Sequence, residues 1–93
     1  MHPFLVFHVL DQNNKNRILE INFLHQVVID NYKDHVKRAY NFAIIKDVTR
    51  DFSSNKFFLH FFTSEKPLPY VSAYECQRDF TVDAILLAIS QAR

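Results

Sequence analysis

The sequence predicts an α+β domain of seven short antiparallel strands closed by one C-terminal amphipathic helix. Short apolar runs separated by polar breaks follow one another through the first three quarters of the chain, as strands and turns do. Residues 79–92 give the only convincing helix, because their apolar side chains repeat clearly at helical spacing. With 93 residues and a hydrophobic fraction of 48%, the chain is expected to form a single domain, residues 1–93, with its own core.

A hairpin is expected to open the chain. Residues 4–10 form a mostly apolar run, residues 12–16 are polar and predict a turn, and residues 17–24 resume extended character. From Leu19 to Phe23 apolar and polar residues alternate, which predicts a strand with one face in water.

The next segment predicts three further strands. The β-branched run 27–29 begins the third strand, and a charged loop follows at 33–35. The stretch 36–48 is too long for one strand in so small a domain, so it is expected to split near Tyr40 or Asn41.

Two more strands precede the helix. Residues 51–55 predict a turn, and the run 57–62 is apolar on both faces, so it should be central or covered. Residues 64–69 contain two prolines and are expected to break the chain. Alternation over residues 70–76 then predicts the seventh strand.

The predicted helix carries more apolar surface than one core needs. Asp79 is placed to cap its first turn. The expected core face, at helical spacing, comprises Val82, Ile85, Leu86 and Ile89. A second apolar line, roughly opposite, comprises Phe80, Ala84 and Leu87.

The sequence leaves one alternative fold open. Apolar and aromatic residues of segment 27–40 also recur near i, i+4 and i+8, namely Val27, Val28, Tyr32, His35 and Val36. A helix there would replace the seven-strand sheet with an α+β sandwich containing an additional helix at about 27–40.

Composition excludes several function classes. Eleven basic and ten acidic residues leave a net charge of +1, which gives no field to steer the chain onto nucleic acid. Without glycine, the chain cannot form the phosphate-cradling loops of nucleotide sites. No metal site or cofactor is expected from the spacing of the five histidines. The single Cys76 fits a reducing compartment, which predicts a cytoplasmic protein, and this thiol is expected to be buried and not nucleophilic. No apolar run is long enough to span a bilayer, so we expect a soluble protein, and we expect it to be non-catalytic.

Seven strands and a final helix resemble the pleckstrin-homology (PH) superfold, which phosphotyrosine-binding domains and the third lobe of FERM domains share. The likeness covers the whole chain. Within the superfold, the sequence resembles the N-terminal PH-like segments of the endosomal J-domain family called RME-8. That likeness is carried by the segments 17–21 (RILEI), 28–32 (VIDNY), 57–61 (FFLHF) and 76–79 (CQRD).

The resemblance implies a strongly bent sheet with the helix plugging one end and the loops 12–16, 33–35 and 64–69 at the other. Phosphoinositide-binding members carry several basic residues across the first hairpin, where this sequence has Lys15 and Arg17, and the usual Trp of the final helix is absent. The candidate residues for a phosphorylated headgroup are Lys15, Arg17, Lys33, His35, Lys37 and Lys66. Ordinary solvation of these loops is the competing interpretation.

Peptide-binding relatives use a groove between the fifth strand and the C-terminal helix, where an extended segment adds to a strand edge. The corresponding residues here are Ala43, Ile44, Ile45, Phe80, Ala84 and Leu87. The competing interpretation is that the apolar helix residues only cover the rim of the barrel.

The leading functional hypothesis is therefore an interaction module, or adaptor, that docks a protein segment through the helix and the neighbouring strand. The first alternative is a phosphoinositide-dependent recruitment module at an endosomal or other membrane, as in membrane trafficking or signalling. The second alternative is a homo-oligomeric structural domain.

Overall fold

The computed structural model describes residues 3–93, which form seven antiparallel strands in one sheet and a single α-helix. In chain order the elements are β1 (Phe4–Leu10), β2 (Asn16–Asn22), β3 (Val27–Tyr32), β4 (His35–Asn41), a 3₁₀ turn η1 (Phe42–Ile44), β5 (Ile45–Arg50), β6 (Lys56–Phe61), β7 (Ser64–Val71) and α1 (Glu75–Gln91). This is the predicted fold class. No helix within these residues is long and apolar enough to cross a bilayer.

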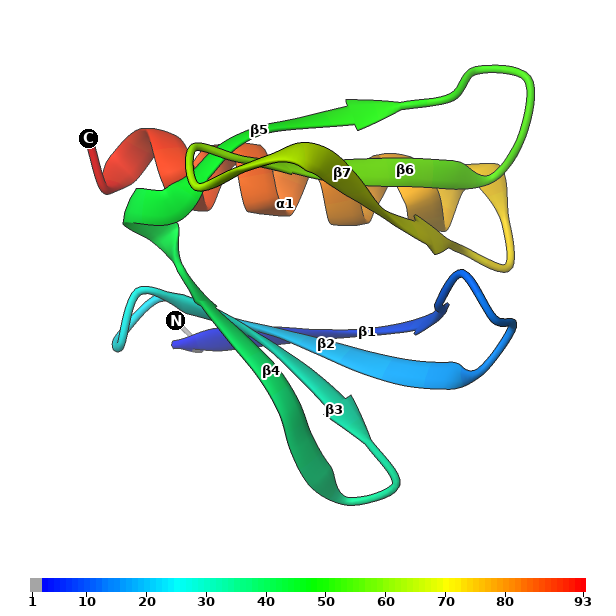
Figure 1. Ribbon diagram of the computed structural model, residues 1–93, viewed down its shortest axis with the longest axis horizontal. Helices are drawn as coiled ribbons and strands as arrows, with labels where there is room; N and C mark the ends of the chain where they lie inside the picture. Colours follow the sequence, from blue (N-terminus) through cyan, green and yellow to red (C-terminus); the bar gives the residue numbers. More distant parts are fainter. Residues whose placement is uncertain (1–2) are drawn as a thin grey trace.

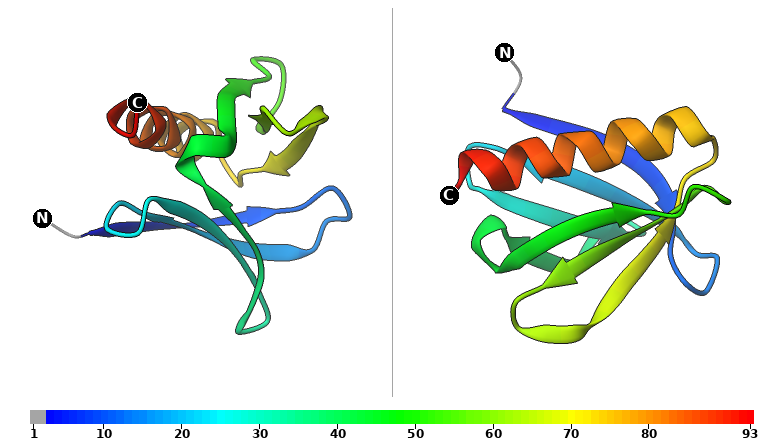
Figure 2. Two further views of the ribbon diagram at one scale, coloured as in Figure 1. Left: turned by 60° about the vertical axis from the view of Figure 1, so that its left-hand side comes forward. Right: turned by 90° about the horizontal axis from the view of Figure 1, so that it is seen from above.

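The sheet is bent into two halves that face each other. Its strand order is β4-β3-β2-β1-β7-β6-β5, but β1 joins β7 at the single pair Leu10 and Val71. From that corner the two halves diverge, and α1 lies across the side where they are apart (Figures 1 and 2). The helix packs most closely along β5.

The core fills the space between the two halves and the helix. Alternation in β2 buries Leu19 and Ile21, and the facing half contributes Phe57 and Leu59 from β6. The expected helical core face is confirmed, with Val82, Ile85 and Ile89 buried and Leu86 half-buried.

The alternative with a helix at about 27–40 is wrong. Residues 27–41 form the hairpin of β3 and β4, with Tyr32 paired to His35. Its two-residue turn consists of Lys33 and Asp34, both at positive φ, as this kind of tight hairpin requires. The predicted split of segment 36–48 is confirmed, since η1 separates β4 from β5 just after Asn41.

The seventh strand lies earlier than predicted. Residues 64–69 were expected to break the chain, yet β7 spans Ser64–Val71. Because Ser72 N–H bonds to Asn55 C=O, the register places the ring nitrogen of Pro69 on the edge that faces away from β6. A proline there removes no ladder hydrogen bond, which explains why the strand tolerates it.

The helix also begins earlier than predicted, at Glu75 instead of Asp79. Its first turn is polar and shows no apolar periodicity, so the sequence pattern missed it. The N-cap is Tyr74, whose side chain makes no capping hydrogen bond. Asp79 is not a cap: it receives hydrogen bonds from the guanidinium groups of Arg78 and Arg50.

Candidate interaction surfaces

The predicted peptide groove between β5 and α1 is bridged by charged side chains. Arg50 of β5 donates to Asp79 at 2.9 Å and to Asp83 at 2.6 Å, both on the helix. The hydrogen bond to Asp83, followed by the Coulomb attraction of both carboxylates, raises the pKa of the Arg50 guanidinium above its ordinary value despite some burial. At the other end of the helix, Arg93 donates to the carbonyl oxygens of Ile45 and Lys46. These contacts occupy the gap between β5 and the helix.

The six residues predicted for that groove are not brought together. Ile45 and Ala84 are buried in the core, whereas Ala43 is exposed and Ile44 half-buried in η1. Phe80 lies on the opposite flank of the helix, beside β1: its ring centroid is 5.7 Å from that of Phe7.

An apolar groove runs between β1 and the first half of α1. Its volume is about 330 Å³, and its lining residues are Val6, Phe7, His8, Cys76, Gln77, Phe80 and Thr81. We call this the β1–α1 groove. Phe80 is 63% exposed above it, so the ring is a surface feature and not part of the core.

The apolar surface continues along the helix beyond the groove. Strand β1 and α1 run in opposite directions (Figure 1). From Phe80 to Leu87 the helix advances about 10 Å, as the strand does from Phe7 back to Phe4, so Leu87 lies towards the Phe4 end. Leu87 is 53% exposed, and Phe4 is exposed as well.

Cys76 borders the groove and is exposed, which corrects the expectation that it is buried. The expectation placed it in a strand leading to the helix. It lies instead in the first turn of α1, on a side that the core does not cover.

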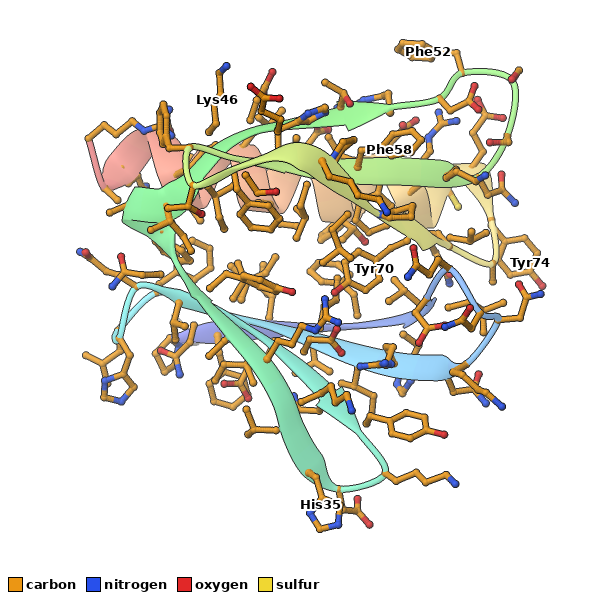
Figure 3. The ribbon with its side chains drawn as sticks, in the orientation of Figure 1. His35, Lys46, Phe52, Phe58, Tyr70 and Tyr74 are labelled. Atoms are coloured by element: carbon orange, nitrogen blue, oxygen red, sulfur yellow. The ribbon has the colours of Figure 1, made fainter. Side chains whose placement is uncertain are left out.

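The basic loops converge only in part. A cavity of about 750 Å³ separates the β1–β2 and β3–β4 turns, and Lys15, Arg17 and Lys33 line it together with Asp34. His35 and Lys37 are exposed on β4 and do not line this cavity. His35 lies at the tip of the β3–β4 hairpin (Figure 3).

Lys66 belongs to a different cavity. That cavity, of about 350 Å³, lies between β4 and the β6–β7 hairpin, and Arg38 lines it as well. It is floored by the rings of Tyr40 and Phe61, whose centroids are 4.9 Å apart.

Arg17 is engaged inside the protein. Its Nε donates to Asp11 at 2.9 Å and its Nη1 to Asp30 at 3.1 Å, and its guanidinium lies 4.8 Å from the centre of the Tyr32 ring. Burial acts to lower the pKa of Arg17, but the two carboxylates outweigh it and raise the pKa above its ordinary value. Arg17 therefore has little capacity left for a phosphate, and no salt bridge within residues 3–93 involves Lys15 or Lys33.

Comparisons with known proteins identify the fold and no family. No known protein family matches the sequence, and no curated protein does. Among solved structures, the chain is similar to a crystal structure of the FERM and C-terminal domain complex of Drosophila Merlin, with a TM-score of 0.82 and 13% sequence identity. The match covers 98% of this chain and 30% of that chain. The PH-like fold is thereby confirmed, while the likeness to the RME-8 family stays a prediction.

Proposed function

From the PH-like fold and the apolar surface beside β1, we propose that this domain is a non-catalytic module that docks a protein segment on α1 and the neighbouring strand. The strand is β1 and not β5, because salt bridges and hydrogen bonds occupy the β5 side of the helix. Phe80 and Leu87 of α1, beside the β1–α1 groove, form the proposed contact surface, which we call the α1 docking face.

One observation supports this proposal above the others: the two large residues of the second apolar line of α1, Phe80 and Leu87, remain exposed in the folded domain, whereas Ala84 is buried. Isolated apolar side chains are common on protein surfaces and need no explanation. Here two large side chains, Phe80 and Leu87, are exposed on the same flank of the helix, and an apolar groove separates Phe80 from β1. Contiguous apolar surface of this kind marks docking sites for other proteins.

Site-specific photo-crosslinking tests the proposal. A photoreactive phenylalanine analogue replaces Phe80 in one version of the protein and Phe52 in another. Phe52 is 79% exposed on the β5–β6 loop, away from the α1 docking face (Figure 3). We expect a discrete cross-linked partner from position 80 and none from position 52, and loss of that partner in the Leu87→Asp variant. Equal cross-linking from both positions contradicts the proposal, and cross-linking of the chain to itself would favour the homo-oligomeric alternative.

A phosphoinositide headgroup is the second candidate ligand, supported by the cavity between the β1–β2 and β3–β4 turns. Lys15 and Lys33 line it, and a phosphate needs such convergent cations to offset its desolvation. Sedimentation with phosphatidylcholine liposomes, with and without phosphatidylinositol phosphates, tests this function. Headgroup-dependent binding that is lost in the Lys15→Ala/Lys33→Ala variant and retained in Phe80→Asp would establish it. Binding to neither liposome would exclude it.

We propose a cytoplasmic setting for this module from its exposed thiol and from the family that it resembles. The exposed thiol of Cys76 suits a reducing compartment such as the cytosol. The RME-8 resemblance adds peripheral association with endosomes, as an adaptor in membrane trafficking or signalling. Imaging of the tagged protein beside an endosomal marker tests this, and a diffuse signal unaffected by Phe80→Asp or by Lys15→Ala/Lys33→Ala would contradict it.

A further inference from the structure

The hydrogen-bond register of β1 leaves one edge of that strand open. Asp11 N–H bonds to Lys15 C=O, and Phe23 N–H bonds to Pro3 C=O. Together with the continuous pairing of β1 and β2, these bonds show that odd-numbered residues of β1 exchange hydrogen bonds with β2. The N–H and C=O groups of Phe4, Val6 and His8 therefore project from the opposite edge.

That opposite edge borders the β1–α1 groove. Strand β7 reaches it only at Leu10, and within residues 3–93 no other backbone segment pairs with β1 on this side. Val6 and His8 both line the groove, with Phe80 on its far wall. Polar backbone groups and an apolar wall thus face the same space.

Three other strand edges are free, those of β4, β5 and β7, and each is protected against pairing. Strand β7 meets β1 only at Val71 and carries Pro67 and Pro69, which lack the N–H group that an added strand would need. Strand β4 carries Lys37 and Arg38 and a register shift beside Asp30, and charges and bulges of this kind discourage an added strand. On β5, Arg93 already donates to two edge carbonyl groups. Strand β1, with the sequence FLVFHVL, contains no Lys, Arg, Asp or Glu. An apolar and uncharged edge is the one most suited to accept another strand.

We propose that the β1 edge binds an extended protein segment as an additional strand of the sheet, with apolar side chains at alternate positions of the segment packed against Phe80 and Leu87. The occupant has to be extended, because only an extended backbone presents donors and acceptors at the spacing of Phe4, Val6 and His8. Its side chains alternate between the helix and solvent, which gives the period-two pattern. This inference rests on the proposed function and specifies its partner.

A phage-displayed library of short linear peptides supplies the probe. Selection on the intact domain should enrich peptides with apolar residues at positions i and i+2 whose binding is lost in the Phe80→Asp variant and retained in Phe52→Asp. The selected peptide is then resynthesised with a single N-methyl group at each position in turn. Methylation should weaken binding by roughly tenfold or more at every second position and little between them, because only alternate N–H groups would face β1.

Two substitutions at Val6 of the domain test the same backbone contact. Val6→Pro removes the N–H group at the open edge without removing a bond to β2, whereas Val6→Thr keeps that N–H and the branched side chain. Peptide affinity should fall roughly tenfold or more in Val6→Pro. It should change little in Val6→Thr, because the side chain of Val6 lies on the outer face of the sheet, opposite to Phe7, and only its backbone groups face the peptide. If Val6→Pro proves unfolded by circular dichroism, the methylation series on the unmodified domain decides the question.

The outcomes separate the two proposals. Peptides that lose binding in Phe80→Asp but show no alternation in the methylation series overturn strand addition and leave docking on the α1 docking face intact. Selection that yields no binder sensitive to Phe80→Asp overturns both. A dimer that forms with rising concentration and is lost in Val6→Pro would replace the peptide with a second copy of the chain, which also overturns this inference.

Discussion

The hydroxyl of Tyr70 donates a 2.6 Å hydrogen bond to the carboxylate of Asp30 in the buried space between the two halves of the sheet. Tyr70 belongs to β7 and Asp30 to β3, so the bond joins strands that do not pair. The pKa of the Tyr70 phenol is raised far above its ordinary value, mainly by burial and to a smaller extent by the hydrogen bond to Asp30. Asp30 also accepts from Arg17, so both of its oxygens have partners.

Removing that hydroxyl should destabilise the fold. In Tyr70→Phe the ring keeps its stacking on Phe57, at 5.7 Å between centroids, but one oxygen of the buried Asp30 loses its donor. The free energy of unfolding, measured by urea titration, should fall by about 1–3 kcal/mol. Tyr74→Phe removes an exposed hydroxyl and should stay within about 0.5 kcal/mol of the unmodified protein. Equal losses in the two variants would contradict the importance of the Asp30 bond.

Asp11 should make stability depend on pH on the acid side. Burial acts to raise its pKa, but the backbone N–H groups of Lys15 and Asn13 and the Arg17 guanidinium together lower it below the ordinary value of 3.8. A carboxyl whose pKa is lower in the folded state stabilises the fold above its unfolded-state pKa, and this contribution is lost as the pH falls through the folded-state value.

The substitution Asp11→Asn tests this dependence. It should lower the free energy of unfolding by about 1–2 kcal/mol at neutral pH. The difference from the unmodified protein should shrink as the pH falls below about 4, where Asp11 becomes protonated in the unfolded state and then in the folded state. Asp34→Asn, in an exposed turn, serves as the control and should show little difference at any pH. A difference that stays constant down to pH 2 would contradict the linkage.

Arg78 should anchor the β5–β6 loop to the helix. Its side chain is 1% exposed and its Nη1 donates to the carbonyl oxygens of Asp51 at 2.9 Å and Ser54 at 2.7 Å. Arg78→Met leaves these carbonyl groups without the donor and should lower the free energy of unfolding by about 2–3 kcal/mol. Arg50→Gln breaks only partly exposed ion pairs and should cost no more than about 1 kcal/mol. Urea titrations compare the two, and a larger loss in Arg50→Gln would contradict this ranking.

Local patterns in the sequence predicted the elements that depend on local order. Alternation identified the buried face of β2 through Leu19 and Ile21, and helical spacing identified Val82 and Ile85 as core residues. Each of these patterns can be recognised within a short stretch of neighbouring residues. The start of α1 escaped prediction because its first turn is held by Arg78, whose partners lie on a loop more than twenty residues earlier.

The flank of the helix that we propose for docking could not be predicted for the same reason. Spacing along the helix placed Phe80 and Leu87 on a second apolar line, but not beside a particular strand. That choice depends on Arg50 pairing with Asp79 and Asp83, 29 and 33 residues away, which fills the β5 side. No local pattern indicates such a pairing, although a lone Arg in a strand followed by Asp residues at i and i+4 of a helix is a signal that could be searched for.

Because the chain contains no glycine, other residues occupy its left-handed backbone positions, and replacing one of them by glycine should change the stability of the domain. Four of the residues that the structure describes have positive φ, none of them glycine, and one is Gln26 with φ 55° in the turn between β2 and β3. The other three include Asn14 and Asp34, whose short polar side chains tolerate this conformation, whereas glutamine does so less readily. Gln26 is exposed, and its carbonyl oxygen, which accepts from Phe42 N–H, would remain in Gln26→Gly.

Gln26→Gly should therefore stabilise the domain by about 0.5–1 kcal/mol, the relief of left-handed strain less the added freedom of the unfolded chain. Gln12→Gly is the matched control, because residue 12 is an exposed turn position without positive φ. There only the entropic cost remains, and the free energy of unfolding should fall by about 0.5–1 kcal/mol. Thermal and urea unfolding of both variants measure the two shifts. Opposite signs support conformational strain at Gln26, and a loss in both would show that the turn holds glutamine without strain.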